Sequence, residues 1–393
     1  MAEPRLRIFV PHASDALTDH RAHGDGLVAF EIVSRLAARG HDLHVASPSI
    51  AIRGPIPRSL HLYEVPMTPR ESLRGRLRYM WQVRQLFLRL RRERRFDVIH
   101  QLNPVFAGIS LSLAGTATPV ALGAYVGAWP PSAERPGLMG ALRVPFAATL
   151  RRAVAAAQQR LAGALIVATP AAESAIVERE RHTGKVVYIP HGIDPALFRV
   201  ADAVPASIEP PTILFLGGTE RRKGIYTLLE AFALVNAEYP ACRLVIGGDG
   251  GRLHEVRAAV NRMRARARVA LLGNVDRRDV PELMRRATVY CAPSIGEPFG
   301  MSLLEAMATG KPVVVTDAGG PAHIVQQGGG EKVPVGDAPA LAAALLRVLR
   351  SPERCRAMGR HNRRIVERTY AWDRVIERIE ATYVALAGPG VAR

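Results

Sequence analysis

The sequence predicts an α/β protein of two domains, and three observations lead to this fold class. The chain has 393 residues, 48% of them hydrophobic, which is enough to bury two cores. Short apolar runs alternate with stretches of helical composition along most of the chain. Several of these runs end in glycine-rich turns that lead into helices. This alternation is typical of parallel sheets built from β-α-β units.

In the N-terminal half, the first expected β-α-β unit spans 6–46. A strand at 6–10 leads through a polar loop to a helix at 27–38, which Gly40 ends, and a second strand follows at 41–46. The loop contains Gly24 and Gly26, and it lies at the carboxyl end of a strand, where open α/β sheets bind ligands. Further strands are expected at 97–100, 119–122, 164–168 and 186–189, and helices at 73–96, 138–161 and 170–181.

The C-terminal half repeats the pattern after a proline-rich linker at 201–211. Strands are expected at 212–216, 244–247, 269–273, 287–292 and 311–316, and helices at 225–236, 301–308 and, with a break near Trp372, 338–387. We therefore expect a first domain over 1–198, a second over 199–372 and a final helix over 373–393.

Composition narrows the function classes and the expected location. The formal charge of +18 favours acidic ligands or an anionic membrane surface. The basic residues are nevertheless scattered, and aromatic residues make up only 6%, so a nucleic-acid-binding protein is disfavoured. The three cysteines are widely separated and show no metal-ligand spacing. No signal peptide or spanning segment is evident, so we expect a cytoplasmic protein, either free or peripheral at the inner membrane face.

The stretch 294–305 is the strongest candidate for a binding site. It carries Glu297 and Glu305 on either side of a turn that contains Pro298 and Gly300. The first amides of the following helix, near Gly300, lack intrahelical acceptors and form an anion site. Carboxylates beside such amides suit a ligand with both phosphate and hydroxyl groups, such as a nucleotide sugar. The alternative is an ordinary surface helix with a glutamate near its N-terminus.

These residues resemble a motif of a known enzyme family. Glu297 and Glu305, with Phe299-Gly300 between them, look like the E-x7-E motif of the retaining glycosyltransferases of family 4. The resemblance continues at His191-Gly-Ile-Asp, Lys223-Gly and Gly247-Gly-Asp-Gly. It implies the GT-B fold, in which two Rossmann-like domains face each other across a cleft and the C-terminal helix crosses back to the N-terminal domain.

The resemblance also implies an activity and a set of roles. A sugar, of the hexosyl class, would move from a nucleoside diphosphate to a hydroxyl acceptor with retention and without a metal or other cofactor. The acceptor would be a cell-envelope glycan, a lipid or a small natural product. Glu297, Lys223 and Arg222 are the expected catalytic residues. The expected donor-binding residues are Glu305, Gly218, Phe299, Gly300, Met301, Ser302, Asn274 and Val275. The expected acceptor- or sugar-positioning residues are Gly24, Gly26, His100 and Tyr125.

Two positions depart from the family pattern. The family usually has an arginine where this chain has Gly218, so Arg221 or Arg222 would have to reach the donor phosphates instead. Many relatives have a histidine near the sugar where this chain has Ala124 and Tyr125, so Tyr125 or His100 would have to serve. These departures keep open two alternatives with the same fold, a non-hydrolysing sugar-nucleotide epimerase and a catalytically silent nucleotide-sugar-binding protein.

The expected helix at 73–96 permits two interpretations. It is rich in arginine and also carries Leu77, Met80 and Trp81. A basic amphipathic helix of this kind can lie on an anionic membrane. An ordinary domain helix whose arginines face water has the same pattern, so membrane contact stays one of two interpretations.

Overall fold

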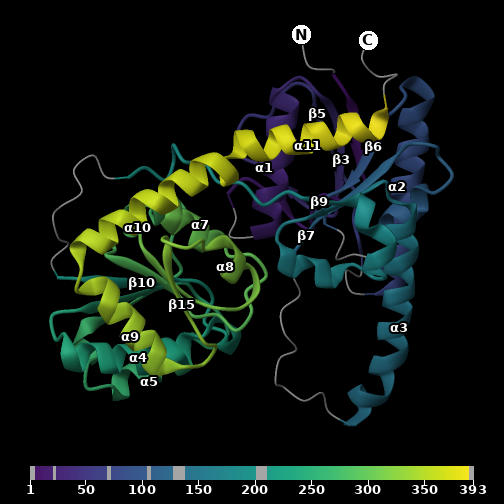
Figure 1. Cartoon of the computed structure of the whole chain (residues 1–393). Helices are drawn as coiled ribbons and strands as arrows, with labels where there is room; N and C mark the ends of the chain where they lie inside the picture. Colours follow the sequence, from purple (N-terminus) through teal and green to yellow (C-terminus); the bar gives the residue numbers. More distant parts are fainter. Residues whose placement is uncertain are drawn as a thin grey trace.

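The computed structural model describes residues 5–20, 24–68, 72–103, 108–126, 138–200 and 210–388, with side chains omitted for 138–148. Two parallel sheets, each flanked by helices, form two domains that lie side by side (Figure 1). The predicted fold class is confirmed. The linker expected at 201–211 falls almost entirely outside the described residues, and the exact domain limits stay a prediction.

The N-terminal domain contains a seven-stranded sheet in the order β5-β3-β1-β6-β7-β8-β9, parallel throughout. Its strands are β1 (Arg7–Val10), β3 (Asp42–Ser47), β5 (Leu60–Glu64), β6 (Val98–Gln101), β7 (Val120–Tyr125), β8 (Ala164–Val167) and β9 (Val186–Tyr188), and β2 (Leu17–Thr18) pairs separately with β4 (Ile50–Ala51). Its helices are α1 (Gly24–Ala38), α2 (Leu73–Glu93) and α3 (Leu138–Leu161), with 3-10 turns at Ile109–Leu113, Pro170–Ala175 and Arg179–Lys185.

The C-terminal domain contains a six-stranded parallel sheet in the order β12-β11-β10-β13-β14-β15. Its strands are β10 (Thr212–Leu216), β11 (Arg243–Gly247), β12 (Val269–Gly273), β13 (Val289–Ala292), β14 (Val313–Thr316) and β15 (Gly330–Val333). Its helices are α4 (Ile225–Glu238), α5 (Leu253–Arg262), α6 (Val280–Arg286), α7 (Met301–Ala308), α8 (Gly319–Ile324), α9 (Ala338–Leu349) and α10 (Pro352–Ile365), with 3-10 turns at Arg221–Lys223 and Arg266–Arg268.

Local sequence explains the composition of the inner strands and the start of two helices. Inner strands such as β8 (Ala-Leu-Ile-Val) and β14 (Val-Val-Val-Thr) are almost wholly apolar and are buried on both faces, as is typical of parallel strands covered by helices. Ser72 caps α2 by accepting a hydrogen bond from the Gly75 amide, and Asp337 caps α9 in the same way.

Two local predictions were wrong. The glycines of the first loop belong to α1, which begins at Gly24, so Gly26 is a buried helical residue instead of a loop contact. The helix expected at 170–181 is two 3-10 turns, because Glu178 adopts a left-handed backbone (φ +55°) that interrupts a continuous helix.

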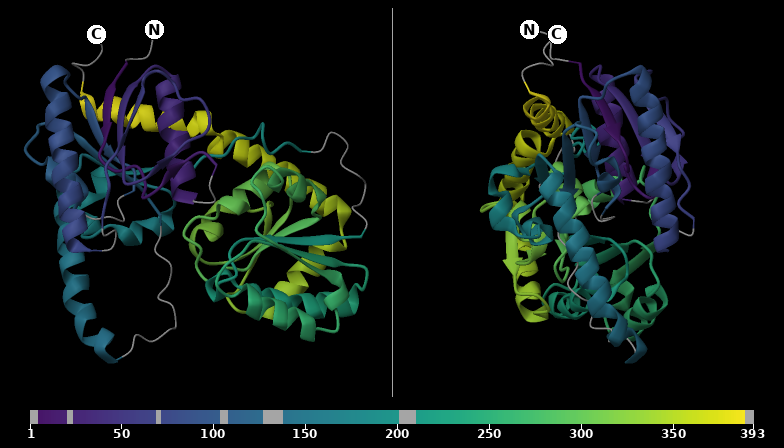
Figure 2. Two further views of the ribbon diagram at one scale, coloured as in Figure 1. Left: turned by 180° about the vertical axis from the view of Figure 1, so that it is seen from behind. Right: turned by 90° about the vertical axis from the view of Figure 1, so that its right-hand side faces the viewer.

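The last helix joins the two domains. After α10, a π-helical turn at Val366–Tyr370 leads into α11 (Trp372–Ala387), which lies along the N-terminal domain (Figures 1 and 2). Trp372, Val375, Ile376, Ile379 and Tyr383 pack into the same buried cluster as β1, β3 and α1. The predicted return of the C-terminal helix to the first domain is confirmed. None of the helices in the described part of the chain is long and apolar enough to cross a bilayer.

Candidate functional site

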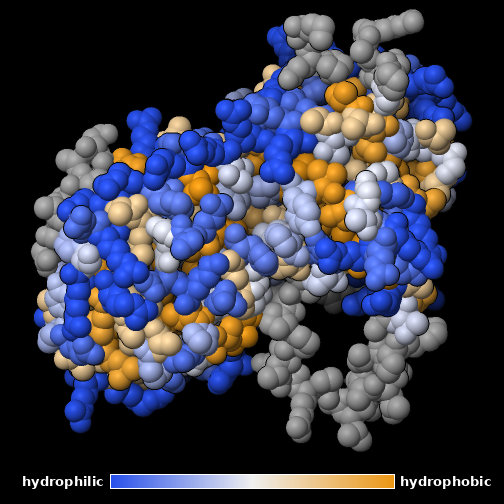
Figure 3. Space-filling model, viewed as in Figure 1, coloured by the Kyte–Doolittle hydropathy of each residue, from blue (hydrophilic) through white to orange (hydrophobic). Residues whose placement is uncertain are grey.

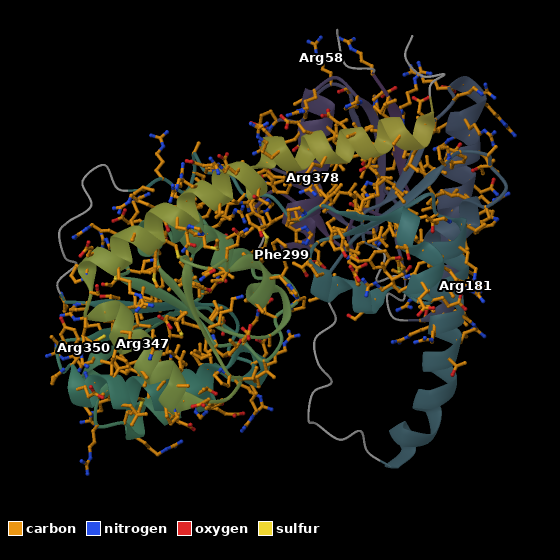
Figure 4. All side chains as sticks on the ribbon, in the orientation of Figure 1. Arg58, Arg181, Phe299, Arg347, Arg350 and Arg378 are labelled. Carbon is orange, nitrogen blue, oxygen red and sulfur yellow. The ribbon has the colours of Figure 1, made fainter. Side chains whose placement is uncertain are left out.

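A cavity of about 1530 Å³ lies between the two domains and is lined by residues of both. Phe299, labelled in Figure 4, lies on the edge of the C-terminal domain that faces the N-terminal domain. The space-filling view shows residues of mixed hydropathy where the two domains meet and hydrophilic residues over much of the visible face (Figure 3). The lining residues include the last residues of β7, β10 and β11, so the cavity lies at the carboxyl ends of parallel strands from both sheets, as expected for a ligand site in open α/β folds.

Lys223 and Glu297 form an ion pair inside this cavity. The Lys223 Nζ lies 2.6 Å from a Glu297 carboxylate oxygen, and both side chains are partly buried. Gly224 makes this approach possible. Its φ is +74°, and a Cβ there would lie 1.8 Å from the Pro293 carbonyl oxygen. A lysine paired in this way is held in one position before any ligand arrives.

The N-terminus of α7 opens into the same cavity. Gly300 precedes the helix with a φ of +103°, and no side chain in the described residues caps it. Gly300, Met301 and Ser302 all line the cavity. The uncapped amides carry the partial positive charge of a helix N-terminus and suit a phosphate group.

Glu305 lies one and a half turns further along α7 and also lines the cavity. Burial raises the pKa of its carboxyl to about 7, and the positive charge of Arg277 partly opposes this rise. Such a carboxyl exists in both protonation states near neutral pH, and hydroxyl donors from a ligand would favour the ionised state.

The structure brings most of the predicted site residues together around this cavity. Its lining includes Lys223, Asn274, Val275, Glu297, Phe299, Gly300, Met301, Ser302, Glu305, Gly24 and Tyr125. Arg222, Gly218, Gly26 and His100 are not part of the lining.

His100 is a structural residue in this arrangement, in contrast to the predicted positioning role. Its Nε2 donates to the Gly123 carbonyl at 2.7 Å, and its Nδ1 accepts from the Tyr383 hydroxyl at 2.6 Å. Burial lowers its pKa to about 4, so the ring is neutral. Both ring nitrogens are used to attach β6 to β7 and α11, so neither is available to a ligand.

Tyr125 does reach the cavity wall, although it is nearly buried. Its hydroxyl accepts a hydrogen bond from the Gln159 side chain at 3.3 Å. Burial raises its pKa to about 12, so it remains a neutral phenol at physiological pH. It can offer a hydroxyl group to a ligand but no charge.

His191 also lines the cavity, and the sequence analysis gave it no role. Its ring packs edge to face on Phe299 at 4.7 Å, and its Nδ1 has no hydrogen-bond partner among the described residues. Burial lowers its pKa to about 4. The sequence signal for this residue is the His191-Gly-Ile-Asp segment, which matches the family pattern.

The part of the cavity lining that comes from the N-terminal domain is mostly apolar and also contains a basic fringe, meaning three arginines of the same lining. Its lining includes Leu73, Leu77, Met80, Leu111, Leu150 and Val154, and the fringe consists of Arg76, Arg151 and Arg152. Leu73 and Leu77 are more than half exposed, as is Trp81 further along α2. This flank suits an apolar chain better than a second polar sugar.

Among the described residues, three side chains outside the cavity can present metal-binding atoms within 4.8 Å of one another, namely Asp42, His44 and His61. Asp42 also pairs with the guanidinium groups of Arg7 and Arg94, at 3.6 and 3.4 Å. These two positive charges oppose a cation there, so we assign the cluster no metal.

Two family models match the chain. Residues 23–197 match the model described as Glycosyltransferase Family 4, and residues 202–365 match Glycosyl transferases group 1. The chain is 37% identical over 212 residues to a phosphatidyl-myo-inositol mannosyltransferase of Mycolicibacterium smegmatis, covering 52% of this chain and 53% of the relative. It is 33% identical over 159 residues to the putative glycosyltransferase EpsD of Bacillus subtilis, covering 40% and 41%. The chain thus spans about half the length of the curated relatives it matches.

Similar solved structures cover almost the whole chain. Sucrose-phosphate synthase from Thermosynechococcus elongatus has a TM-score of 0.75 at 24% identity, over 96% of this chain and 98% of that chain. Anabaena Alr3699/HepE in complex with UDP has a TM-score of 0.74 at 18% identity, over 97% and 100%. At these identities the likeness establishes the two-domain fold alone.

Proposed function

We propose, from the premise that the chain belongs to the family 4 glycosyltransferases, that it transfers a sugar from a nucleoside diphosphate to a hydroxyl group with retention. One observation carries the proposal. The Lys223–Glu297 pair, the uncapped N-terminus of α7 and Glu305 surround one cavity between the domains. The lysine and the helix amides match the phosphates of a nucleotide sugar, and the two carboxylates match its hydroxyl groups.

The proposed roles follow from position. Lys223 and the amides at Gly300, Met301 and Ser302 bind the diphosphate. Glu305 accepts hydrogen bonds from the ribose hydroxyls, and Glu297 from the sugar hydroxyls. Asn274 and Val275, at the cavity wall after β12, contact the base. In this assignment 199–372 is the donor domain and 1–198 the acceptor domain.

In the proposed reaction the bond between the anomeric carbon and the phosphate oxygen breaks, and a bond to the acceptor oxygen forms on the same face. The leaving phosphate takes the acceptor proton, so no separate general base is needed. Lys223 and the α7 amides stabilise the negative charge that develops on the phosphate, and the cleft holds donor and acceptor together.

The apolar flank of the cavity supports a lipid acceptor with a polar head. Leu73, Leu77 and Met80 would contact its hydrocarbon part, while Arg76 and Arg151 lie near enough to meet an anionic head group. The mycobacterial relatives are named for a phosphatidyl-myo-inositol acceptor, which has this chemistry. The exposed apolar side chains of α2 would then place the cavity mouth at an anionic membrane surface.

The first experiment measures thermal stabilisation by UDP, GDP and ADP without added metal, using wild type and Lys223→Ala. A ligand present at 100 times its dissociation constant adds about 2.7 kcal/mol. We expect one nucleotide to stabilise the wild type and to lose most of this effect in Lys223→Ala. If no nucleotide stabilises the wild type, the donor site is wrongly assigned.

Turnover separates the transferase from the two alternatives. An epimerase would convert its nucleotide sugar without any acceptor. A silent binding protein would bind the nucleotide sugar and leave it unchanged with every acceptor. The proposed transferase releases nucleoside diphosphate only when a hydroxyl acceptor is supplied, apart from slow hydrolysis.

Membrane contact is tested by sedimentation with phosphatidylglycerol-containing vesicles. We expect wild type to sediment at low salt, and Leu77→Gln/Trp81→Gln to bind several-fold less, because both side chains are exposed on α2. Leu234→Gln is the matched control, because this exposed leucine lies on α4 of the other domain. Equal binding by wild type and the α2 variant would contradict membrane docking through α2.

A further inference from the structure

The donor cavity contains less positive charge from its glycine-rich loop than the sequence predicts. The loop that follows β10 carries three cations, Arg221, Arg222 and Lys223. Of these three, Lys223 is the one that lines the cavity, and its ammonium is already paired with Glu297. The Arg221 guanidinium stacks over the Tyr226 ring at 5.0 Å. One lysine shared with a carboxylate balances a diphosphate poorly.

Position 218 cannot supply the missing charge in this arrangement. A Cβ built on Gly218 would lie 2.2 Å from a carboxylate oxygen of Glu220. The Glu220 side chain thus fills the space that a side chain at 218 would need, and it adds a negative charge beside the loop. Position 218 carries no side chain, and neither Arg221 nor Arg222 lines the cavity, so we look to another element for the compensating cation.

Arg277 is a cation of the cavity lining that comes from a different loop. It follows Asn274 and Val275 in the loop after β12, and it lines the main cavity. A smaller cavity of about 100 Å³ is lined in part by the same residues, since Arg277, Gly24, Met301 and Glu305 border both. Arg277 therefore lies among the first residue of α1, the first residue of α7 and Glu305.

The charges around Arg277 favour a ligand contact. Its neighbour Arg278 pairs with Asp276, at 3.0 and 3.1 Å, and the second acidic residue of this loop, Asp279, is the N-cap residue of α6 and does not line the cavity. The charge of Arg277 also lowers the pKa of Glu305, against the effect of burial, so the guanidinium acts electrostatically on the cavity interior. The smaller cavity is also lined by the carboxylates of Glu31, Asp194 and Glu305, so the groups there that can bind an anion are the Arg277 guanidinium and the amides of two helix N-termini.

We infer that Arg277 supplies the second positive charge for the donor diphosphate, in place of the glycine-rich loop after β10. This inference rests on the proposed function. A guanidinium at this place forms charge-assisted hydrogen bonds to phosphate oxygens, and these strengthen as the leaving group gains charge.

The test compares three ligands that differ only in phosphate number. Affinities of wild type, Arg277→Gln and Arg278→Gln are measured by calorimetry for uridine, UMP and UDP, and for the guanosine series. We expect Arg277→Gln to weaken diphosphate binding by roughly tenfold to a hundredfold and nucleoside binding by less than about twofold. Arg278→Gln, outside the cavity lining, should bind like wild type.

Each other outcome has a defined meaning. An equal loss for nucleoside and diphosphate would show that Arg277 acts through Glu305 and the ribose, and would overturn the inference. Unchanged binding in Arg277→Gln, with loss in Lys223→Ala, would overturn the inference and leave the proposed function standing. If wild type binds neither series, both proposals fail.

A rescue variant provides an independent check. Glu220→Ser removes the carboxylate above Gly218, and Gly218→Arg then places a guanidinium beside Lys223. When this double change is added to Arg277→Gln, the affinity for the diphosphate should rise at least tenfold above that of Arg277→Gln alone. The affinity for the nucleoside should stay unchanged. No recovery in a folded variant, judged by its thermal transition, would show that the lost charge was not acting on the phosphates.

Discussion

Glu305 is the residue at which stability and ligand binding oppose each other. Burial raises the pKa of its carboxyl from the ordinary 4.5 to about 7. The unfolded chain binds fewer protons than the folded chain between these values, so this group lowers stability as pH rises from 4.5 to 7. The full cost, on the order of 3 kcal/mol, is present above pH 7. A buried carboxyl that lowers the free energy of unfolding in this way is a candidate for ligand contact.

Binding of the nucleoside diphosphate should therefore release a proton near neutral pH. Ribose hydroxyls that donate to Glu305 favour its ionised form, so affinity should rise about tenfold between pH 6 and 8 as this group ionises. Calorimetry in buffers of different ionisation enthalpy measures the proton directly. Glu305→Gln is the control for the titration of the nucleotide itself. If the variant releases as many protons as wild type, Glu305 is not the group that titrates.

At the residue scale, the sequence identified candidate side chains of the site but not the packing and hydrogen bonds around each of them. Glu297 and Glu305 were found because one short motif carries both, and Lys223 was found because a separate Lys-Gly segment matches the family pattern. His100 has the same chemistry as a ligand-binding histidine, and only the packing of α11, 283 residues later, shows that its Nδ1 is occupied. Arg277 was missed because arginine is common throughout this chain.

At the element scale, the N-terminus of α8 fixes the loop that carries Glu297. The Gly320 amide donates to the Glu297 carbonyl oxygen at 2.7 Å. Gly319 has a φ of +62°, and a Cβ there would lie 2.3 Å from the same oxygen. The two glycines therefore let one helix lie directly against the loop between β13 and α7, which positions Glu297 without any side-chain contact.

Gly320→Ala should disturb the site more than the fold. The new Cβ would lie 2.6 to 2.7 Å from backbone atoms of Phe299 and Pro298, so the loop must shift. Such a shift costs about 1–3 kcal/mol in stability and, by misplacing Glu297, on the order of a hundredfold in turnover. Thermal unfolding and sugar transfer measure the two effects. Gly251→Ala, which meets nothing within 4 Å, is the control and should resemble wild type in both. Equal turnover in the two variants would contradict this role for α8.

The element pattern was largely predictable, for a physical reason. Parallel strands buried on both faces are apolar throughout, and helices between them end at glycine, so both signals are local. The failures were the start of α1 and the type of the helix expected at 170–181. α1 starts at Gly24, although glycine disfavours a helix and the expected start was three residues later. Tertiary contacts that override such local preferences leave no local signal.

At the scale of the whole molecule, α11 connects the two halves of the chain. Trp372 packs so closely on Gly192, at the crossing between the domains, that a Cβ there would lie 2.3 Å from the indole ring. Further along, Glu380 is nearly buried and accepts from Arg39 at 2.7 Å and from His41 Nε2 at 2.9 Å. The Leu6 amide donates to His41 Nδ1, which fixes the proton on Nε2. The helix is thus attached to the N-terminal domain by both apolar packing and a satisfied polar network.

Glu380→Ala should detach this helix in part and destabilise the N-terminal domain by about 3 kcal/mol, because it leaves Arg39 and the buried His41 without their acceptor. Glu377→Ala is the matched control. Glu377 lies one turn earlier, 4.0 Å from Arg39 and 44% exposed, so its loss should cost less than about 0.5 kcal/mol. Urea unfolding followed by circular dichroism measures both variants, and the first transition is the relevant one, since two domains need not unfold together. If the two variants unfold at the same urea concentration, the polar network does not hold α11, and its apolar packing alone joins the domains.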